Sequence, residues 1–372
     1  MLTKEVIDTK RCGKITVFLQ VCCFTFILAA FSAQGPLTYT VTILTVHDLG
    51  VNHNELVNFT AHESMDQLLN KCTWVHVLIP GQGDGDPDLP QNYTFPGMQE
   101  LAEALGEICD ALSLKHVVLF GEGAGANILA RLAMVREDLV LGAVLIHCTG
   151  TTAGITENIR DRLFGWKLNT VGMNPSAESY LLFHRFGSMS EPEDEVELKH
   201  TLEGFRKSLR ESVNPKNLNR FIMAFMARSN IIEKVDQIRC PVLFLTGSLA
   251  SHNHTVHKLY NALRASAKNE PNRLKHIELI QLDDVANVLR ERPDRVAETL
   301  QYFIQGLGLA GGVVSRRMST TLPPPQARMR SLSMEEYDQP KGVSTCIYDK
   351  HRKYSTALGD SGDAEKPQNA RI

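Results

Sequence analysis

The segment HVVLFGEGAGANILARLAM, residues 116–134, decides the fold of this chain. An apolar run at 116–120 leads into GEGAG at 121–125, and apolar residues at helical spacing follow at once. This is the pattern of the G-x-S-x-G nucleophile elbow, in which a strand turns sharply into a helix and holds a serine above a sheet. Gly123 stands at the serine position, so the pattern predicts an elbow without a nucleophile.

Strands and helices alternate on both sides of this elbow. Alternation of this kind predicts a mostly parallel sheet with helices on both faces. Residues 152–236 interrupt the alternation with helical patterns and few strands, and we expect a helical lid there. A sheet, an elbow, a lid and a returning sheet together make the plan of the α/β-hydrolase fold. The predicted strands are 41–46, 74–80, 116–120, 139–150, 240–247 and 275–282, and the predicted helices are 97–112, the elbow to about 135, and 293–308.

Composition divides the chain into three parts. Residues 1–40 hold a first strand and an apolar insertion, and residues 41–310 form the α/β-hydrolase-like domain. Gly, Ser, Pro and Arg dominate after Gly308, so residues 311–372 are predicted to be a disordered tail.

The apolar stretch at 15–33 admits two interpretations. It follows four basic residues and ends in small ones, which is typical of a signal peptide, and it has the length of a marginal membrane span. The segment GKITVFLQ within it has instead the composition of a β-strand. We expect residues 21–33 to be an insertion in a cytoplasmic domain; secretion or membrane anchoring through 15–33 is the alternative.

The remaining triad positions are also occupied by residues without catalytic side chains. The acid is expected in the loop after strand 240–247, where Ala250 stands, and the histidine is expected before Glu291-Arg292-Pro293, where counting back reaches Ala286. A serine needs a base, and the base needs a third group to hold it. The sequence therefore predicts no catalytic residue, and a pocket remnant formed by His47, Asp48, Gly121, Glu122 and Ala124.

Three classes of function remain open. They are a non-catalytic signalling or adaptor protein, a small-molecule or lipid-binding pseudoenzyme, and a hydrolase with a displaced active site. A metal site from His252, His254 and Asp283 has only a weak spacing signal, and no cofactor or metal is predicted. The net charge of −3 argues against nucleic acid as a partner.

Several motifs together resemble the N-myc downstream-regulated (NDRG) family. They are LTVHDLGVNH at 44–53, VLIPGQGDG at 77–85, FPGMQELAEAL at 95–105, GEGAGANILARLAM at 121–134 and RCPVLFLTG at 239–247. The resemblance covers about residues 41–310. It implies an α/β-hydrolase-like, non-catalytic protein of the cytoplasm that is linked to signalling, stress response, differentiation and trafficking.

The tail carries candidate phosphorylation sites. Arg328 and Arg330 precede Ser333 in an R-x-R-x-x-S spacing, and two arginines precede Ser319. Such spacing suits basophilic kinases, which bind extended chain in acidic pockets. We predict phosphorylation at Ser319, Ser331 and Ser333; the protein partners themselves are not identified by the sequence, and membrane association is not favoured.

Overall fold

The computed structural model describes residues 2–21, 41–69, 71–151, 172–187 and 196–309. The chain divides into two units, Met1–Val314 and Ser315–Ile372. The second unit lies outside the described residues, as do Ser319, Ser331, Ser333 and the predicted insertion at 21–33 apart from residue 21. The predicted disorder of 311–372 therefore stays a prediction.

The described part of the first unit is built on one eight-stranded sheet with the strand order β1-β2-β4-β3-β5-β6-β7-β8. The pairs β1/β2 and β2/β4 are antiparallel, and every other neighbouring pair is parallel. The predicted mostly parallel sheet is thus confirmed. The strands are β1 (Leu2–Thr9), β2 (Gly13–Gln20), β3 (Val41–Val46), β4 (Cys72–Leu78), β5 (Val117–Glu122), β6 (Val140–Ile146), β7 (Val242–Gly247) and β8 (Ile277–Leu282).

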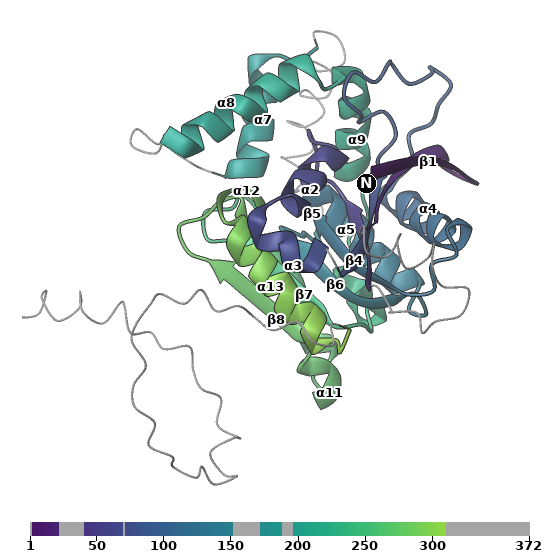
Figure 1. Cartoon of the computed structure of the whole chain (residues 1–372), viewed down its shortest axis with the longest axis vertical. Coiled ribbons are helices and arrows are strands. Elements are labelled where there is room, and N and C mark those ends of the chain that lie inside the picture. The colour runs from purple at the N-terminus through teal and green to yellow at the C-terminus, as the bar shows by residue number, and fades with distance from the viewer. Residues whose placement is uncertain (1, 22–40, 70, 152–171, 188–195, 310–372) are drawn as a thin grey trace, which may run out of the picture. The chain divides into compact units, whose positions relative to one another are not determined.

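Both faces of the central strands of the sheet are buried, because side chains alternate along each strand and helices cover each side. In β5, Val117 and Leu119 join one apolar core with α4 (Met98–Ala111), α5 (Gly123–Val135) and α10 (Asn253–Ser266). Val118 and Phe120 join the other core with α2 (His53–Thr60), α3 (Asp66–Leu69) and α13 (Pro293–Gly306). Figure 1 shows this layering, with α3 and α13 in front of the strands.

The structure agrees with the strand interpretation of residues 15–20. These residues belong to β2, which pairs with β4 from Thr16↔Leu78 to Gln20↔Trp74. The strand β1 before it was not predicted, since LTKEVIDT is too polar to show a buried face. Among the described residues, no helix is both long and apolar enough to cross a bilayer.

The part of the predicted lid that the structure describes is helical. It inserts between β6 and β7 and consists of α7 (Pro175–Phe186), α8 (Val196–Glu211), α9 (Pro215–Met226) and the 3₁₀ segment η2 (Ile232–Gln237). Asn174 and Asn214 cap α7 and α9, and each cap is followed by proline at the first helical position. Residues 152–171 and 188–195 of the predicted lid lie outside the residues that the structure describes. Three short elements complete the described part of the fold: η1 (Glu63–Met65), α11 (Pro271–Leu274) and α12 (Val288–Glu291).

Candidate functional site

The candidate site lies where several parallel strands end. Asp48 follows β3, Gly123 follows β5, and His147 follows β6. Ala250 and Asn287 come from the loops after β7 and β8. Carboxyl ends of parallel strands share one edge of the sheet, which is where ligands bind in open α/β folds. The lid helix α7 adds His184 and Arg185.

The elbow backbone is retained although its nucleophile is absent. Gly123 adopts φ +54°, the left-handed conformation that makes a nucleophile elbow strained for other residues. A Cβ atom added to Gly123 would lie 2.1 Å from Oδ1 of Asp48. The carboxylate of Asp48 therefore fills the space that the nucleophile's side chain occupies in a hydrolase.

The same carboxylate occupies the oxyanion hole. In α/β-hydrolases this hole is formed by the backbone N–H after the nucleophile and an N–H from the loop after strand β3. Here the Ala124 N–H donates to Asp48 Oδ1 at 2.7 Å, and the Leu49 backbone N–H also bonds to this carboxylate. The protein thus supplies its own anion where a tetrahedral intermediate would place one.

A chain of buried polar groups extends from Asp48 into the lid. His184 Nε2 lies 3.0 Å from Asp48 Oδ2, and His184 Nδ1 lies 3.3 Å from His252 Nε2. Burial alone would raise the pKa of Asp48, but the charge and hydrogen bond of His184 outweigh it and hold that pKa below its usual range. Asp48 is therefore ionised, and its contact with His184 holds α7 against the end of β3.

A second buried network joins the lid to the elbow through Arg185. Its guanidinium donates to Glu55 at 2.5 Å and to Glu122 at 3.3 Å, and its side chain is 1% exposed. Asn287 Nδ2 donates to the other oxygen of Glu122 at 2.6 Å. Burial raises the pKa of Glu122 to about 7 in spite of the opposing attraction of Arg185.

Three histidines around the elbow are neutral at pH 7. Burial lowers the pKa of His47 and His147 to about 4 and that of His252 to about 3. His47 Nε2 accepts from the Ile79 N–H at 3.1 Å, so its proton lies on Nδ1, which donates to the Asp48 carbonyl at 2.9 Å. His47 thus has both ring nitrogens committed to the backbone.

The space enclosed by these groups is too small for a substrate. The elbow cavity has a volume of about 10 Å³, which is at the lower limit for one water molecule. Ser251 is the hydroxyl in its lining, and its Oγ donates to the His184 carbonyl at 2.8 Å instead of to an imidazole. The residues that line it are Asp48, Glu122, Gly123, His147, His184, Arg185, Ala250, Ser251, His252 and Asn287.

The structure thus brings Gly123 and Ala250 together, while Ala286 is fully buried directly before the lining residue Asn287. Gly121 packs closely, since a Cβ there would lie 2.6 Å from Leu129 Cδ1. Among the described residues, no group of three His, Cys, Asp or Glu side chains is arranged to hold a metal ion.

Sequence reasoning did not single out His184 and Arg185. They are adjacent polar residues in the last turn of an otherwise apolar helix segment, YLLFHRF. That contrast is a signal for buried polar partners, but it does not say which strand ends the two side chains reach.

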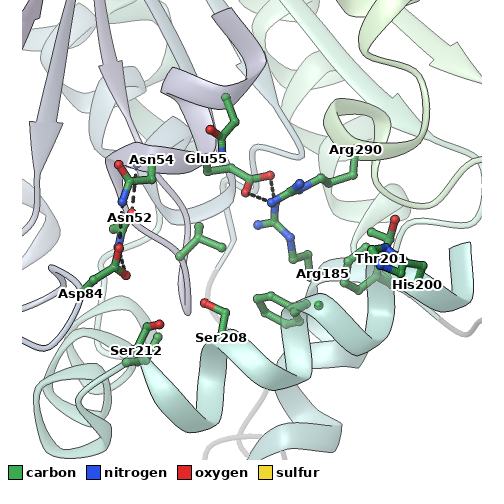
Figure 2. Close-up of a pocket in the computed structure, with 16 residues that line it drawn as sticks. Asn52, Asn54, Glu55, Asp84, Arg185, His200, Thr201, Ser208, Ser212 and Arg290 are labelled. Carbon is green, nitrogen blue, oxygen red and sulfur yellow. Dashed lines mark hydrogen bonds and ion pairs between the residues drawn. The ribbon is translucent and has the colours of Figure 1, made fainter. Parts of the chain in front are cut away.

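A larger, polar cavity lies beside the elbow cavity, with Arg185 in the wall of both. This α8 pocket has a volume of about 370 Å³. Figure 2 shows Glu55 meeting both Arg185 and Arg290 on one side, Asn52, Asn54 and Asp84 on another, and Ser208 and Ser212 of α8 opposite. Its lining comprises Val51, Asn52, Asn54, Glu55, Asn58, Asp84, Arg185, Phe186, His200, Thr201, Gly204, Phe205, Ser208, Ser212, Val213 and Arg290.

The fold and the retained elbow define the class of this protein as the α/β-hydrolase fold, and similar solved structures agree. An esterase from Thermogutta terrifontis superimposes with a TM-score of 0.62 at 14% identity, over 82% of this chain and 99% of the esterase. A bacterial membrane phospholipase A superimposes with a TM-score of 0.56 at 18% identity, over 83% of this chain and 87% of that chain. At these identities the likeness concerns the fold alone.

Within that class, the chain belongs to the Ndr family, whose model matches residues 30–311. An uncharacterized protein of Caenorhabditis elegans is 33% identical over 350 residues, covering 92% of this chain and 95% of the relative. NDRG3 of Xenopus laevis is 28% identical over 277 residues, covering 72% of this chain and 69% of the relative. The predicted family resemblance is confirmed.

Proposed function

We propose that this chain is a non-catalytic protein of the cytoplasm that acts through partner binding in signalling, stress response or differentiation. The observation that carries the non-catalytic part is the position of Asp48: one carboxylate fills both the nucleophile's space at Gly123 and the hydrogen bond from the Ala124 N–H. The signalling part is supported by membership of the Ndr family.

Two physical consequences of this geometry oppose acyl transfer. The tetrahedral oxyanion of acyl transfer needs free N–H donors, and the donor at Ala124 already bonds to an ionised carboxylate. The oxyanion that develops from a substrate carbonyl would also lie within a few ångströms of the Asp48 charge, and like charges repel strongly in a dry interior. Even the residual catalysis that an oxyanion hole provides without its triad is lost in this arrangement.

A hydrolase assay tests this part of the proposal. The purified full chain is assayed with acyl esters of several chain lengths, beside a mock preparation and beside Asp48→Ala, which frees the Ala124 N–H. We expect background turnover in all three samples, because neither protein has a nucleophile. The proposal would be overturned by an esterase activity that follows the wild-type protein through purification and is lost in Glu122→Gln.

The tail is proposed to regulate the binding of partners by phosphorylation at Ser319, Ser331 and Ser333. Each phosphate adds roughly −1.5 to −2 charges, so two phosphates reverse the charge of the basic stretch around Arg328 and Arg330. Phosphopeptide mapping from cells should find Ser333 occupied, and Arg328→Ala with Arg330→Ala should remove that signal. Persistence of the signal in the double variant would contradict kinase recognition through these arginines.

A second candidate function is the binding of a small polar molecule in the α8 pocket. Its volume of about 370 Å³ falls within the range of ligand sites. Polar side chains, charged, amide and hydroxyl-bearing, make up most of its lining, which favours a polar, hydrogen-bonding ligand over an acyl chain.

Gly204 offers a test of that pocket. A Cβ there would meet no atom within 4 Å, so the backbone accepts a side chain at this position, and Gly204→Leu should narrow the pocket that Gly204 lines. Native mass spectrometry of the full chain should detect a co-purifying small molecule in the wild type and lose it in Gly204→Leu, with Gly306→Leu in the distant helix α13 as the control. A ligand retained equally by both variants would exclude this site.

A further inference from the structure

The strand β1 forms one edge of the eight-stranded sheet. All eight of its residues pair in unbroken antiparallel register with β2, from Leu2↔Gln20 to Thr9↔Gly13. No other described strand pairs with the outer side of β1, and Figure 1 shows β1 at the margin of the molecule. A regular edge of this length presents a row of peptide N–H and C=O groups that can pair with another strand.

The strand β1 has charged side chains, which protect many edge strands, but it lacks two other protecting features. The sequence LTKEVIDT contains no proline, and the register shows no bulge, two features by which proteins commonly block an edge strand. Val6 is 56% exposed and Leu2 is 43% exposed, and both point to the same face, because residues two or four apart in a strand share a face. The edge thus combines open backbone groups with exposed apolar side chains.

Lys4 and Asp8 flank Val6 on that same face. Neither makes an ion pair with another described residue. They carry opposite charges and stand at equal distances, two residues each, on either side of Val6. This spacing makes the strand complementary to itself when it runs antiparallel to a second copy.

Symmetry restricts the registers in which two such edges can pair. A twofold axis that joins two antiparallel edges runs perpendicular to the sheet, so it keeps each face of the sheet on the same side. One residue of β1 must then lie opposite its own copy. With Val6 on the axis, Lys4 of each copy lies opposite Asp8 of the other. With Glu5 or Lys4 on the axis, two like charges meet directly, which is destabilising.

We propose that two copies of this chain associate through β1, antiparallel, with Val6 on the twofold axis. The backbone groups of the two edges form the ladder, the two valines make an apolar contact on the axis, and two Lys4–Asp8 pairs fix the register. The surface is then a homodimer interface that is distinct from the elbow cavity, and the dimer would place one elbow site in each half of one continuous sheet.

Charge exchange tests the register. Sedimentation equilibrium of the full chain should show a dimer, and Lys4→Asp should weaken it by at least about tenfold, because two attractive cross-strand pairs become repulsive. The combination of Lys4→Asp with Asp8→Lys should restore the association to within about threefold. Asp8 also faces Lys14 of β2, so the melting temperature of each variant is measured to show that the hairpin is intact.

Cross-linking gives an independent readout. Val6→Cys should form a dimer with a short bismaleimide, and adding Lys4→Asp should abolish that product. Leu2→Cys, on the same face but four residues from the axis, is the matched control and should not react in this way; wild type gives the background from native cysteines. A monomer at all concentrations, a dimer that Lys4→Asp does not weaken, or cross-linking at Leu2→Cys equal to that at Val6→Cys would overturn the proposal.

Discussion

The Oδ1 atom of Asp48 lies 2.1 Å from the point where a Cβ atom at Gly123 would stand. The position of Asp48 therefore depends on the glycine at 123, because the elbow must lack a side chain for the carboxylate to reach the Ala124 N–H. The direction in which a substitution of either residue changes the stability of the fold can therefore be predicted.

Gly123→Ala should destabilise the fold strongly. The variant carries a left-handed backbone strain of roughly 1–2 kcal/mol, and the clash with Asp48 should add about 1–3 kcal/mol, the range for overpacking. Urea denaturation compares it with Gly85→Ala, where φ is +66° and an added Cβ meets no atom within 4 Å. The control isolates the backbone strain, so equal losses in the two variants would contradict the clash.

Asp48→Asn should lower the free energy of unfolding by about 3–5 kcal/mol at pH 7, because it removes one partner of a buried pair with His184. The pKa of Asp48 in the folded state is lower than its unfolded value of about 3.9. Its stabilisation is therefore complete above that value and is lost as the pH falls through the folded pKa.

We accordingly expect the difference in the free energy of unfolding between wild type and Asp48→Asn to be constant from pH 7 to 5. This difference should become smaller below about pH 4. Urea titrations at a series of pH values measure it, with the exposed Asp283→Asn as the control. A gap that widens on acidification would show that the carboxylate is not ionised in the fold.

Glu122→Gln should show the opposite pH dependence. The pKa of Glu122 is raised by burial to about 7, above its unfolded value, so ionisation of Glu122 costs stability as the pH rises from about 4.3 to 7. Glutamine keeps an oxygen for the Asn287 amide and carries no charge. Relative to wild type, the variant should therefore gain stability between pH 5 and pH 8, as thermal melting at the two pH values will show. A difference that stays constant between the two pH values would mean that Arg185 keeps Glu122 ionised throughout.

Arg185→Met and Arg290→Met form a matched pair, since both arginines contact Glu55. The Arg185 side chain is 1% exposed and also holds Glu122, so its loss leaves buried carboxylates uncompensated and should cost about 3–5 kcal/mol. Arg290 is 43% exposed, and its loss should cost about 0–1 kcal/mol. Similar losses in chemical denaturation would mean that the network is not centred on Arg185.

The sequence was sufficient to predict the fold, because strands buried on both faces are continuous apolar runs and the elbow is a local motif. The strand at 41–46 was predicted at its observed ends, and the helix at 97–112 within one residue of each end. The degenerate elbow at Gly123 was predicted for the same local reason. Strand 74–80 was placed two residues late, since Ile79 and Pro80 continue the apolar run past the last ladder pair.

The contacts within the site could not be predicted from the sequence. Asp48 was named as part of a remnant, but its role depends on contacts with Ala124 and with His184, which is 136 residues away. Helix periodicity indicates which face of α7 is buried, and it carries no information on which strand ends that face meets. The edge strand β1 was missed because a strand exposed along most of its length lacks an alternating pattern.

The contact between Asp48 and Gly123 also limits which single substitutions the site can accept. A serine nucleophile at 123 would collide with Asp48 unless residue 48 also changed. A change at residue 48 alone would leave the buried His184 without its carboxylate partner. Each single step is thus a loss of stability without any gain in activity. The need for stability alone would therefore keep Gly123 and Asp48 as they are, whatever the surface of the protein binds.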